Sequence, residues 1–168
     1  MATMSQDSFA QNITNPARVY LFEVFIPGPP EGDTTTYLLR AQSASRPERS
    51  FGQIVIPFKQ TPGVVYPGKD TVPHTWDVTF VEAEDRKLFT NFLNWMNRII
   101  NNRFGTGNPI FKIDIYLHEL NTDGTVANKI KMMGAYPQRM GDVPLDYSRE
   151  EQMMMPVTFA YDRWESAN

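Results

Sequence analysis

The sequence contains no cysteine and only two histidines, His74 and His118. Without cysteine there is no disulfide, no thiolate nucleophile and no sulfur ligand for zinc or an iron–sulfur cluster. The two histidines stand on separate predicted strands, which gives a metal site too few ligands, so we expect neither a metal nor a cofactor. No apolar run approaches the ~18 residues that a membrane span needs, and we expect no membrane anchoring.

Catalytic patterns are also missing. Gly63–Lys69 has the spacing of a phosphate-binding loop, but Pro67 removes a backbone amide and Asp70 replaces the hydroxyl that would bind magnesium. The adjacent carboxylates Glu150 and Glu151 lack the apolar pocket that would separate the pKa values of an acid and a base. We therefore predict no catalytic residues and no enzymatic activity.

Positive charge is scarce as well. Sixteen Lys and Arg stand against 19 Asp and Glu, a formal net charge of -3. Tight binding to duplex DNA requires an excess of positive charge, so specific nucleic-acid binding is not expected. The 168 residues suffice for one core, and we predict an N-terminal arm at 1–17 and a single domain at 18–168. The chain begins without a basic, apolar leader, which favours a protein that stays in the cytoplasm.

Alternating apolar and polar residues predict a mostly β protein. Residues 18–26 are apolar on both faces and predict a strand buried on each side. In residues 74–81 apolar and polar side chains alternate, which predicts a sheet with one solvent-exposed face. Residues 43–73 are rich in proline and turn residues and predict a long projecting hairpin or loop, which implies a partner. The remaining strands are predicted at 35–41, 53–58, 111–118, 129–133 and 153–164.

One amphipathic helix is predicted from Glu84 to Arg103, with Glu84 and Asp85 in its first turn. Its apolar residues recur at helical spacing and are expected to pack on a sheet. Replacing Leu93 by aspartate would then bury a charge and unfold the subunit. The apolar residues are Leu88, Phe89, Phe92, Leu93, Met96, Ile99 and Ile100.

The opposite side of this helix is polar, and it predicts either a protein contact or an ordinary solvated surface. Its candidate residues are Lys87, Asn91, Asn94 and Arg98. Together these patterns predict an α+β fold that is mostly β. It would consist of antiparallel sandwich or barrel-like sheets, one packed amphipathic helix and a long projecting hairpin or loop.

Three local patterns resemble the tail tube proteins of contractile-tailed bacteriophages. The resemblance extends from about Pro16 to Glu165. It implies a six-fold ring in which the sheets of neighbouring subunits join into one barrel, and rings that stack into a tube inside a contractile sheath. The patterns are Tyr66-Pro67-Gly68 followed by Trp76–Phe80, Gly134–Pro137 with Gly141–Tyr147, and Val157–Glu165.

The resemblance also implies partners and a location. The chain would be a structural protein of the virion tail, assembled in the host bacterial cytoplasm, with the polar helix face turned toward the sheath. Its partners would be further copies of itself, the sheath, the tape-measure protein, the baseplate and the tail terminator, while DNA passes through the lumen without specific binding. Two alternatives stay open: the tube of a type VI secretion system or phage-derived injection particle, and an initiator or terminator ring at a tube end.

Charge is distributed unevenly along the chain. Residues 40–69 contain five basic residues and one acidic residue, whereas residues 140–168 contain six acidic and two basic residues. We predict that Arg46 and Arg49 of one ring meet carboxylates of the next ring, at Asp142, Asp146 or Glu150. Pairing of these charges within one chain is the alternative.

Overall fold

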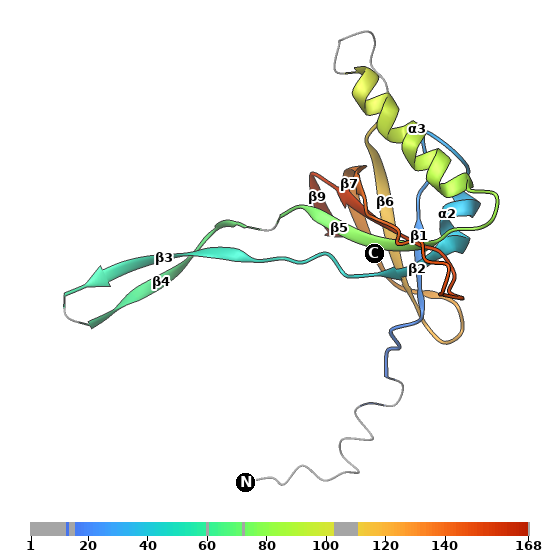
Figure 1. Cartoon of the computed structure of the whole chain (residues 1–168). Helices are drawn as coiled ribbons and strands as arrows, with labels where there is room; N and C mark the ends of the chain where they lie inside the picture. Colours follow the sequence, from blue (N-terminus) through green and yellow to red (C-terminus); the bar gives the residue numbers. More distant parts are fainter. Residues whose placement is uncertain (1–12, 14–15, 60, 72, 103–110, 168) are drawn as a thin grey trace.

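The computed structural model describes residue 13 and residues 16–59, 61–71, 73–102 and 111–167. Most of the predicted arm at 1–17 and Arg103 lie outside these residues. The prediction of a mostly antiparallel β fold with a packed helix and a projecting hairpin is confirmed (Figure 1). The elements are, in order, β1 (Phe22–Phe25), α2 (Thr34–Arg40), β2 (Ala41–Ala44), β3 (Phe51–Phe58), β4 (Thr61–Asp70), β5 (Thr75–Val81), α3 (Lys87–Asn102), β6 (Ile113–Leu120), β7 (Val126–Met140), β8 (Met154–Ala160) and β9 (Arg163–Ser166).

Seven of these strands form one sheet in the order β1-β6-β7-β8-β5-β2, with β9 also paired to β7. β7 is long enough to serve two halves of the sheet, because Val126–Ala135 pair with β6 and Tyr136–Met140 pair with β8. Gly134 lies at the end of the first stretch with φ +64°, and a Cβ there would collide with the Asp162 carboxylate. The backbone thus leaves the extended conformation at Gly134. The sheet does not close into a barrel.

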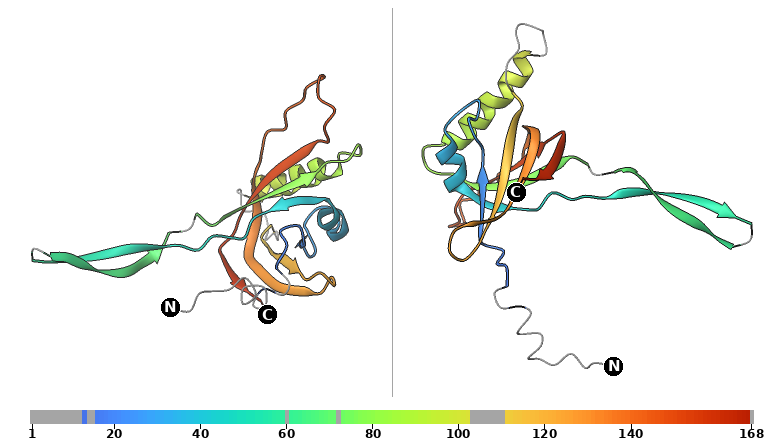
Figure 2. Two further views of the ribbon diagram at one scale, coloured as in Figure 1. Left: turned by 90° about the horizontal axis from the view of Figure 1, so that it is seen from below. Right: turned by 180° about the vertical axis from the view of Figure 1, so that it is seen from behind.

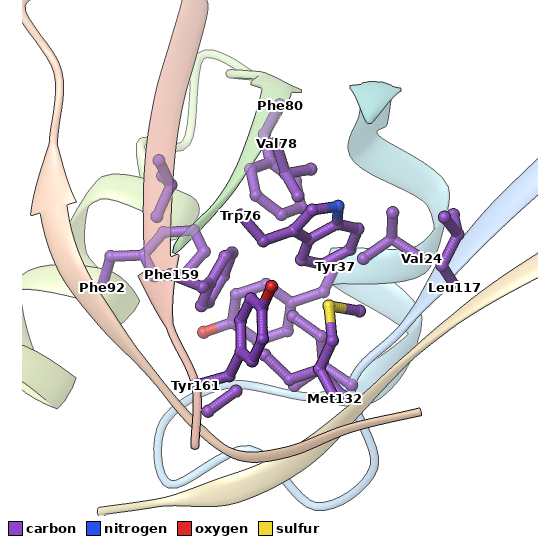
Figure 3. Packing of buried hydrophobic residues seen from close by; sticks show 14 of the residues in the cluster. Val24, Tyr37, Trp76, Val78, Phe80, Phe92, Leu117, Met132, Phe159 and Tyr161 are labelled. Carbon is purple, nitrogen blue, oxygen red and sulfur yellow. The ribbon is translucent and has the colours of Figure 1, made fainter. Parts of the chain in front are cut away.

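Both halves of the sheet contribute to one hydrophobic core (Figure 3). The predicted alternation on β5 and β8 is confirmed, because every second side chain of each strand is buried. Across the core, β1 and β6 supply Val24 and Leu117, and β7 supplies Met132. The buried residues of β5 and β8 are Trp76, Val78, Phe80, Met155, Val157 and Phe159.

Helix α3 covers the core with only part of its apolar surface. Leu88, Phe92 and Trp95 are fully buried, whereas Phe89, Leu93 and Ile100 are 48%, 38% and 52% exposed. The expectation that the whole apolar face packs on the sheet is therefore wrong, and so is the reason given for unfolding by Leu93→Asp. Phe89 and Leu93 each follow a buried residue by a single position, and Ile100 follows the partly buried Ile99, so each lies roughly 100° further round the helix.

The start of α3 also differs from the prediction, because Glu84 and Asp85 precede the helix. The buried carboxylate of Glu82 accepts a hydrogen bond of 2.8 Å from the Phe89 amide, which would otherwise be one of the unpaired donors of the first turn. Arg40, at the end of α2, lies 3.6 Å from Glu82 and 3.1 Å from Asp85. This cluster joins the two helices.

Residues 34–40 form helix α2, where a strand was predicted at 35–41. Three threonines favour a strand locally, but Asp33 caps the helix by accepting a 2.7 Å hydrogen bond from the Thr36 amide. Tyr37 is fully buried and donates a hydrogen bond to the Glu31 carbonyl at 2.8 Å. Capping and burial of Tyr37 together outweigh the strand propensity.

The first strand is shorter and less covered than predicted. β1 spans only Phe22–Phe25 and lies at the end of the strand order, so it has one paired neighbour within the described part of the chain. Val19 and Tyr20, placed in the buried strand by the sequence pattern, are 96% and 64% exposed. In sequence, an apolar run at the edge of a sheet cannot be distinguished from a central strand, because its composition does not show how many strands pair with it.

The Arg40 to Asp85 contact predicts how stability depends on pH. Hydrogen bonds from Arg40 and then from the Lys87 amide hold the pKa of Asp85 at about 2, against 3.8 as its ordinary value. The carboxylate therefore stabilises the fold above about pH 4, and this contribution is lost as the pH falls through about 2. Asp85→Asn should lower the urea midpoint at about pH 6 and match the unmodified chain near pH 2. The control is Glu84→Gln at the neighbouring exposed carboxylate; an equal loss with that variant would contradict the assignment.

Candidate functional site: surfaces for assembly

The two histidines lie apart in the structure, and His118 has its Nδ1 3.9 Å from the Glu23 carboxylate. His118 packs on the ring of Phe25 with 5.7 Å between centroids, and burial lowers its pKa. His74 contacts the ring of Tyr161, on a different part of the sheet. Among the described residues no group of three His, Asp or Glu is arranged to hold a metal ion. Within the same residues, no helix has the length and apolar character to cross a membrane.

The most conspicuous surface is the hairpin formed by β3 and β4, which confirms the predicted projection of residues 43–73. It extends away from the sheet in all three views (Figures 1 and 2). Cross-strand pairing places four side chains on one face, each 51–54% exposed, and Val55 and Val65 on the other. We call the first set the hairpin face: Ile54, Ile56, Val64 and Tyr66.

The hairpin exposes apolar side chains away from the hydrophobic core of its own chain, so these side chains require another surface to pack against. Isolated two-stranded hairpins are marginal in water, and contiguous exposed apolar patches usually mark an interface. The exposed residues of the hairpin face lie on alternate positions of β3 and β4, as in a strand pair that packs on a surface. The geometry therefore favours a contact with another chain.

Arg46 and Arg49 lie where the hairpin leaves the sheet, and both have partners in their own chain. Arg46 pairs with Glu119 through two nitrogens and holds the pKa of Glu119 below its ordinary value. The Arg49 guanidinium lies 4.4 Å from the centroid of the Trp164 ring. Trp164 in turn donates to the Glu48 carbonyl at 3.1 Å. These contacts attach the root of the hairpin to β6 and β9.

The predicted acidic partners lie elsewhere, on the loop formed by residues 141–153. Asp142, Asp146 and Glu150 are all exposed, and the structure brings none of them to Arg46 or Arg49 of the same chain. Bonds from the Ser148 amide and hydroxyl lower the pKa of Asp146. Arg46 does pair within its own chain, but with Glu119, which lies in neither of the two charged segments. The contact between rings therefore stays a prediction.

The four predicted residues on the polar side of α3 have different surroundings. Arg98 pairs with Glu31 at 2.5 Å, and Asn91 is half-buried against Gly32, where a Cβ would collide with its amide. Lys87 lies 3.5 Å from Asp85 but remains exposed, and Asn94 is exposed. Lys87 and Asn94 are therefore the more accessible half of this set.

The sheet itself offers two edges. In the half formed by β2, β5, β8 and the second part of β7, the described residues pair β2 only with β5. The same holds for Tyr136–Met140 of β7, which among described strands pair only with β8. Unpaired edges present rows of backbone donors and acceptors to a neighbouring strand. This four-stranded half is thus open on both sides.

Comparisons with known proteins identify the family of this chain. The family model described as phage tail tube protein matches residues 5–167. No curated protein sequence matches the chain.

Solved structures share the fold at low sequence identity. The cap of the anti-feeding prophage, a tube terminating cap, is 19% identical with a TM-score of 0.67, over 91% of this chain and 91% of that one. The sheath/tube terminator of the PVC extracellular contractile injection system is 20% identical with a TM-score of 0.67, over 92% and 98%. A chain of the PVC sheath-tube complex is 20% identical with a TM-score of 0.63, over 98% and 100%. At this identity the likeness concerns the fold.

Proposed function

The chain belongs to the phage tail tube protein family, and from that premise we propose that it assembles into stacked hexameric rings that form the inner tube of a contractile tail. In this proposal residues 18–168 form the tube domain and residues 1–17 an arm. The observation that carries it is the four-stranded half-sheet with two open edges, since an edge of one subunit can pair with an edge of the next.

The number of strands gives a ring whose diameter can accommodate duplex DNA. Six subunits with four strands each would place about 24 strands, spaced ~4.8 Å and tilted ~40°, around a backbone diameter of roughly 48 Å. Side chains leave room for duplex DNA inside. We assign to the lumen the outer face of β5 and β8, where Thr158 donates to Asp77 at 2.5 Å. Six copies at -3 each give the ring a formal charge of -18, which disfavours tight phosphate binding.

The proposal includes partners and a location. The tube lies in the virion tail after assembly in the host cytoplasm, encloses the tape-measure protein and then DNA, and meets the sheath, the baseplate and the tail terminator. It acts as a structural protein without catalysis. A terminator ring is the second candidate, because two of the similar structures are tube terminators. The tube of an injection particle is a variant of the first proposal, and genes next to the coding sequence would separate the two.

Electron microscopy of the purified protein tests the proposal. We expect rings at low concentration and tubes of open-ended length at higher concentration, with sedimentation coefficients that rise with concentration. Single rings that never stack would favour the terminator. A species of one subunit at every concentration, also with tail components added, would reject both.

The accessible polar residues of α3 predict the sheath contact. Lys87→Glu with Asn94→Glu should leave tube length unchanged and weaken binding of the sheath protein, because two negative charges replace a cation and an amide on an exposed surface. Cosedimentation of sheath with preformed tubes measures the effect. The matched control is Thr35→Glu with Leu39→Glu, which adds two negative charges on the exposed side of α2. Equal sheath binding by the α3 variant and the unmodified tube would contradict the assignment.

The root of the hairpin gives a charge-swap test of Arg46. Arg46→Glu with Arg49→Glu should shorten tubes while single rings persist, and added salt should restore part of the length. If Arg46 acts through Glu119 of its own chain, Arg46→Glu combined with Glu119→Arg should recover longer tubes than Arg46→Glu alone. Recovery instead by Asp142→Arg, Asp146→Arg or Glu150→Arg would favour the contact between rings. Tube lengths in electron micrographs measure each outcome.

A further inference from the structure

Two apolar surfaces of this chain lack a cover within the described residues, and they complement each other. The first is the hairpin face defined above. The second runs along α3, where Phe89, Leu93, Met96 and Ile100 recur at spacings of four, three and four residues and form one stripe. We call this second surface the α3 stripe. It lies beside the buried row of the helix and opposite the face proposed to meet the sheath.

At Phe89 the α3 stripe meets a hollow beside the loop at residues 141–153, which we call the acidic loop. A cavity of 350 Å³ lies between Phe89 and the start of that loop, with Met140, Val143, Leu145 and Met153 among its lining residues. Leu145 is 80% exposed at the edge of this cavity. Phe89 belongs to both the α3 stripe and this cavity, so the two surfaces meet at that residue, and we call them together the groove. Glu82, Arg86 and Asp142 also line the cavity, so the groove is apolar along the stripe and mixed at the cavity. An exposed apolar surface next to a hollow can accept a row of apolar side chains.

Charge adds a second complementarity. The loop at residues 141–153 carries Asp142, Asp146, Glu150 and Glu151 against Arg149, which is 4 - 1 = 3 excess negative charges. Hairpin residues 51–70 carry Lys59 and Lys69 against Asp70, an excess of one positive charge. Lys59 is exposed beside the turn of the hairpin, with its ammonium 5.8 Å from the Phe58 ring centroid. The end of the hairpin and the rim of the groove are thus of opposite sign.

The hairpin cannot reach the groove of its own chain. It extends away from the sheet, while α3 lies over the sheet itself (Figures 1 and 2). A contact between unlike surfaces of two copies is heterologous, and such contacts generate rings or open stacks when repeated. In a tube built from copies of one chain, the hairpin of each copy can therefore contact the groove of a neighbouring copy.

We propose that the hairpin face of one copy docks into the groove between the α3 stripe and the acidic loop of a neighbouring copy, with Lys59 toward the acidic rim. This inference rests on the proposed tube function and specifies the surface that receives the hairpin. It assigns to Phe89, Leu93 and Ile100 a role in assembly, which explains large apolar side chains at exposed positions of a helix. It also assigns to the acidic loop a partner other than Arg46 and Arg49.

Cysteine crosslinking tests the docking directly, because the chain has no cysteine of its own. The test variant is Ile56→Cys with Leu93→Cys, treated with a short bismaleimide after assembly. The matched control is Ile56→Cys with Asn94→Cys, which moves one cysteine to the adjacent exposed position off the stripe. All three sites are at least partly exposed, so the subunits should melt within about 4 °C of the unmodified chain.

We expect a ladder of covalent multimers that is several-fold stronger with Leu93→Cys than with Asn94→Cys. Val64→Cys with Phe89→Cys should give the same result at a second place in the contact. Tubes in the micrographs with no preference for the α3 stripe in either pair would overturn the docking and leave the tube proposal standing. Single subunits in the micrographs and on the gel would reject the tube proposal and the docking together.

Discussion

Replacing Phe92 by alanine is expected to lower the free energy of unfolding by about 3–5 kcal/mol, the range for an aromatic side chain removed from a packed core. Phe92 is fully buried, and its ring contacts four others, at centroid distances of 5.1 Å to Tyr37, 5.4 Å to Phe80, 5.9 Å to Phe159 and 6.4 Å to Trp95. These rings belong to both helices and to β5 and β8, the two inner strands of the four-stranded half of the sheet. The cavity would therefore open where all layers of the subunit meet.

Leu93→Ala, at the next position of the same helix, is the matched control. Its side chain is 38% exposed in the subunit, so the free energy of unfolding should fall by no more than about 1 kcal/mol. Urea denaturation of subunits kept below the assembly concentration measures both variants. Equal decreases in the free energy of unfolding for the two variants would show that the α3 stripe packs in the core of the subunit.

Ile56→Asp is expected to have the largest effect on assembly. The carboxylate would enter a contact made by the hairpin face, and every subunit of a ring would repeat it. We expect the protein concentration needed for tubes to rise by at least about tenfold, which corresponds to 1.4 kcal/mol for each contact. The free subunit should keep its melting temperature, because Ile56 is 53% exposed and lies outside the core.

Gln53→Asp provides the comparison for this variant. Gln53 is an exposed residue of the same strand, on the opposite face of the hairpin, and the change introduces the same charge. Its tubes should form near the concentration of the unmodified chain, as measured by pelleting and electron microscopy. Tubes from Ile56→Asp at the unmodified concentration would remove the hairpin face from the assembly contact.

The sequence alone predicted the elements whose signals are local. Alternation of apolar side chains located β5 and β8 and identified their buried faces, because a strand buried on one side requires a period of two. Proline and turn residues at 43–73 predicted a projecting segment, which is the β3 and β4 hairpin. The motifs from Tyr66 to Glu165 identified the family. The residues of the assembly surfaces stay predictions.

Tertiary structure decided the features that depend on contacts between distant residues. Helix α2 forms in a threonine-rich segment because Tyr37 is buried against Phe80 and Phe92, which follow it far along the chain. The helical period of α3 marked seven apolar residues, but the area of the sheet decided which of them are covered. Arg46 meets Glu119 because β6 passes the root of the hairpin, and charge counts along the sequence contain no distances. Local periodicity reports what a residue prefers, whereas burial and pairing depend on which surfaces the fold brings together.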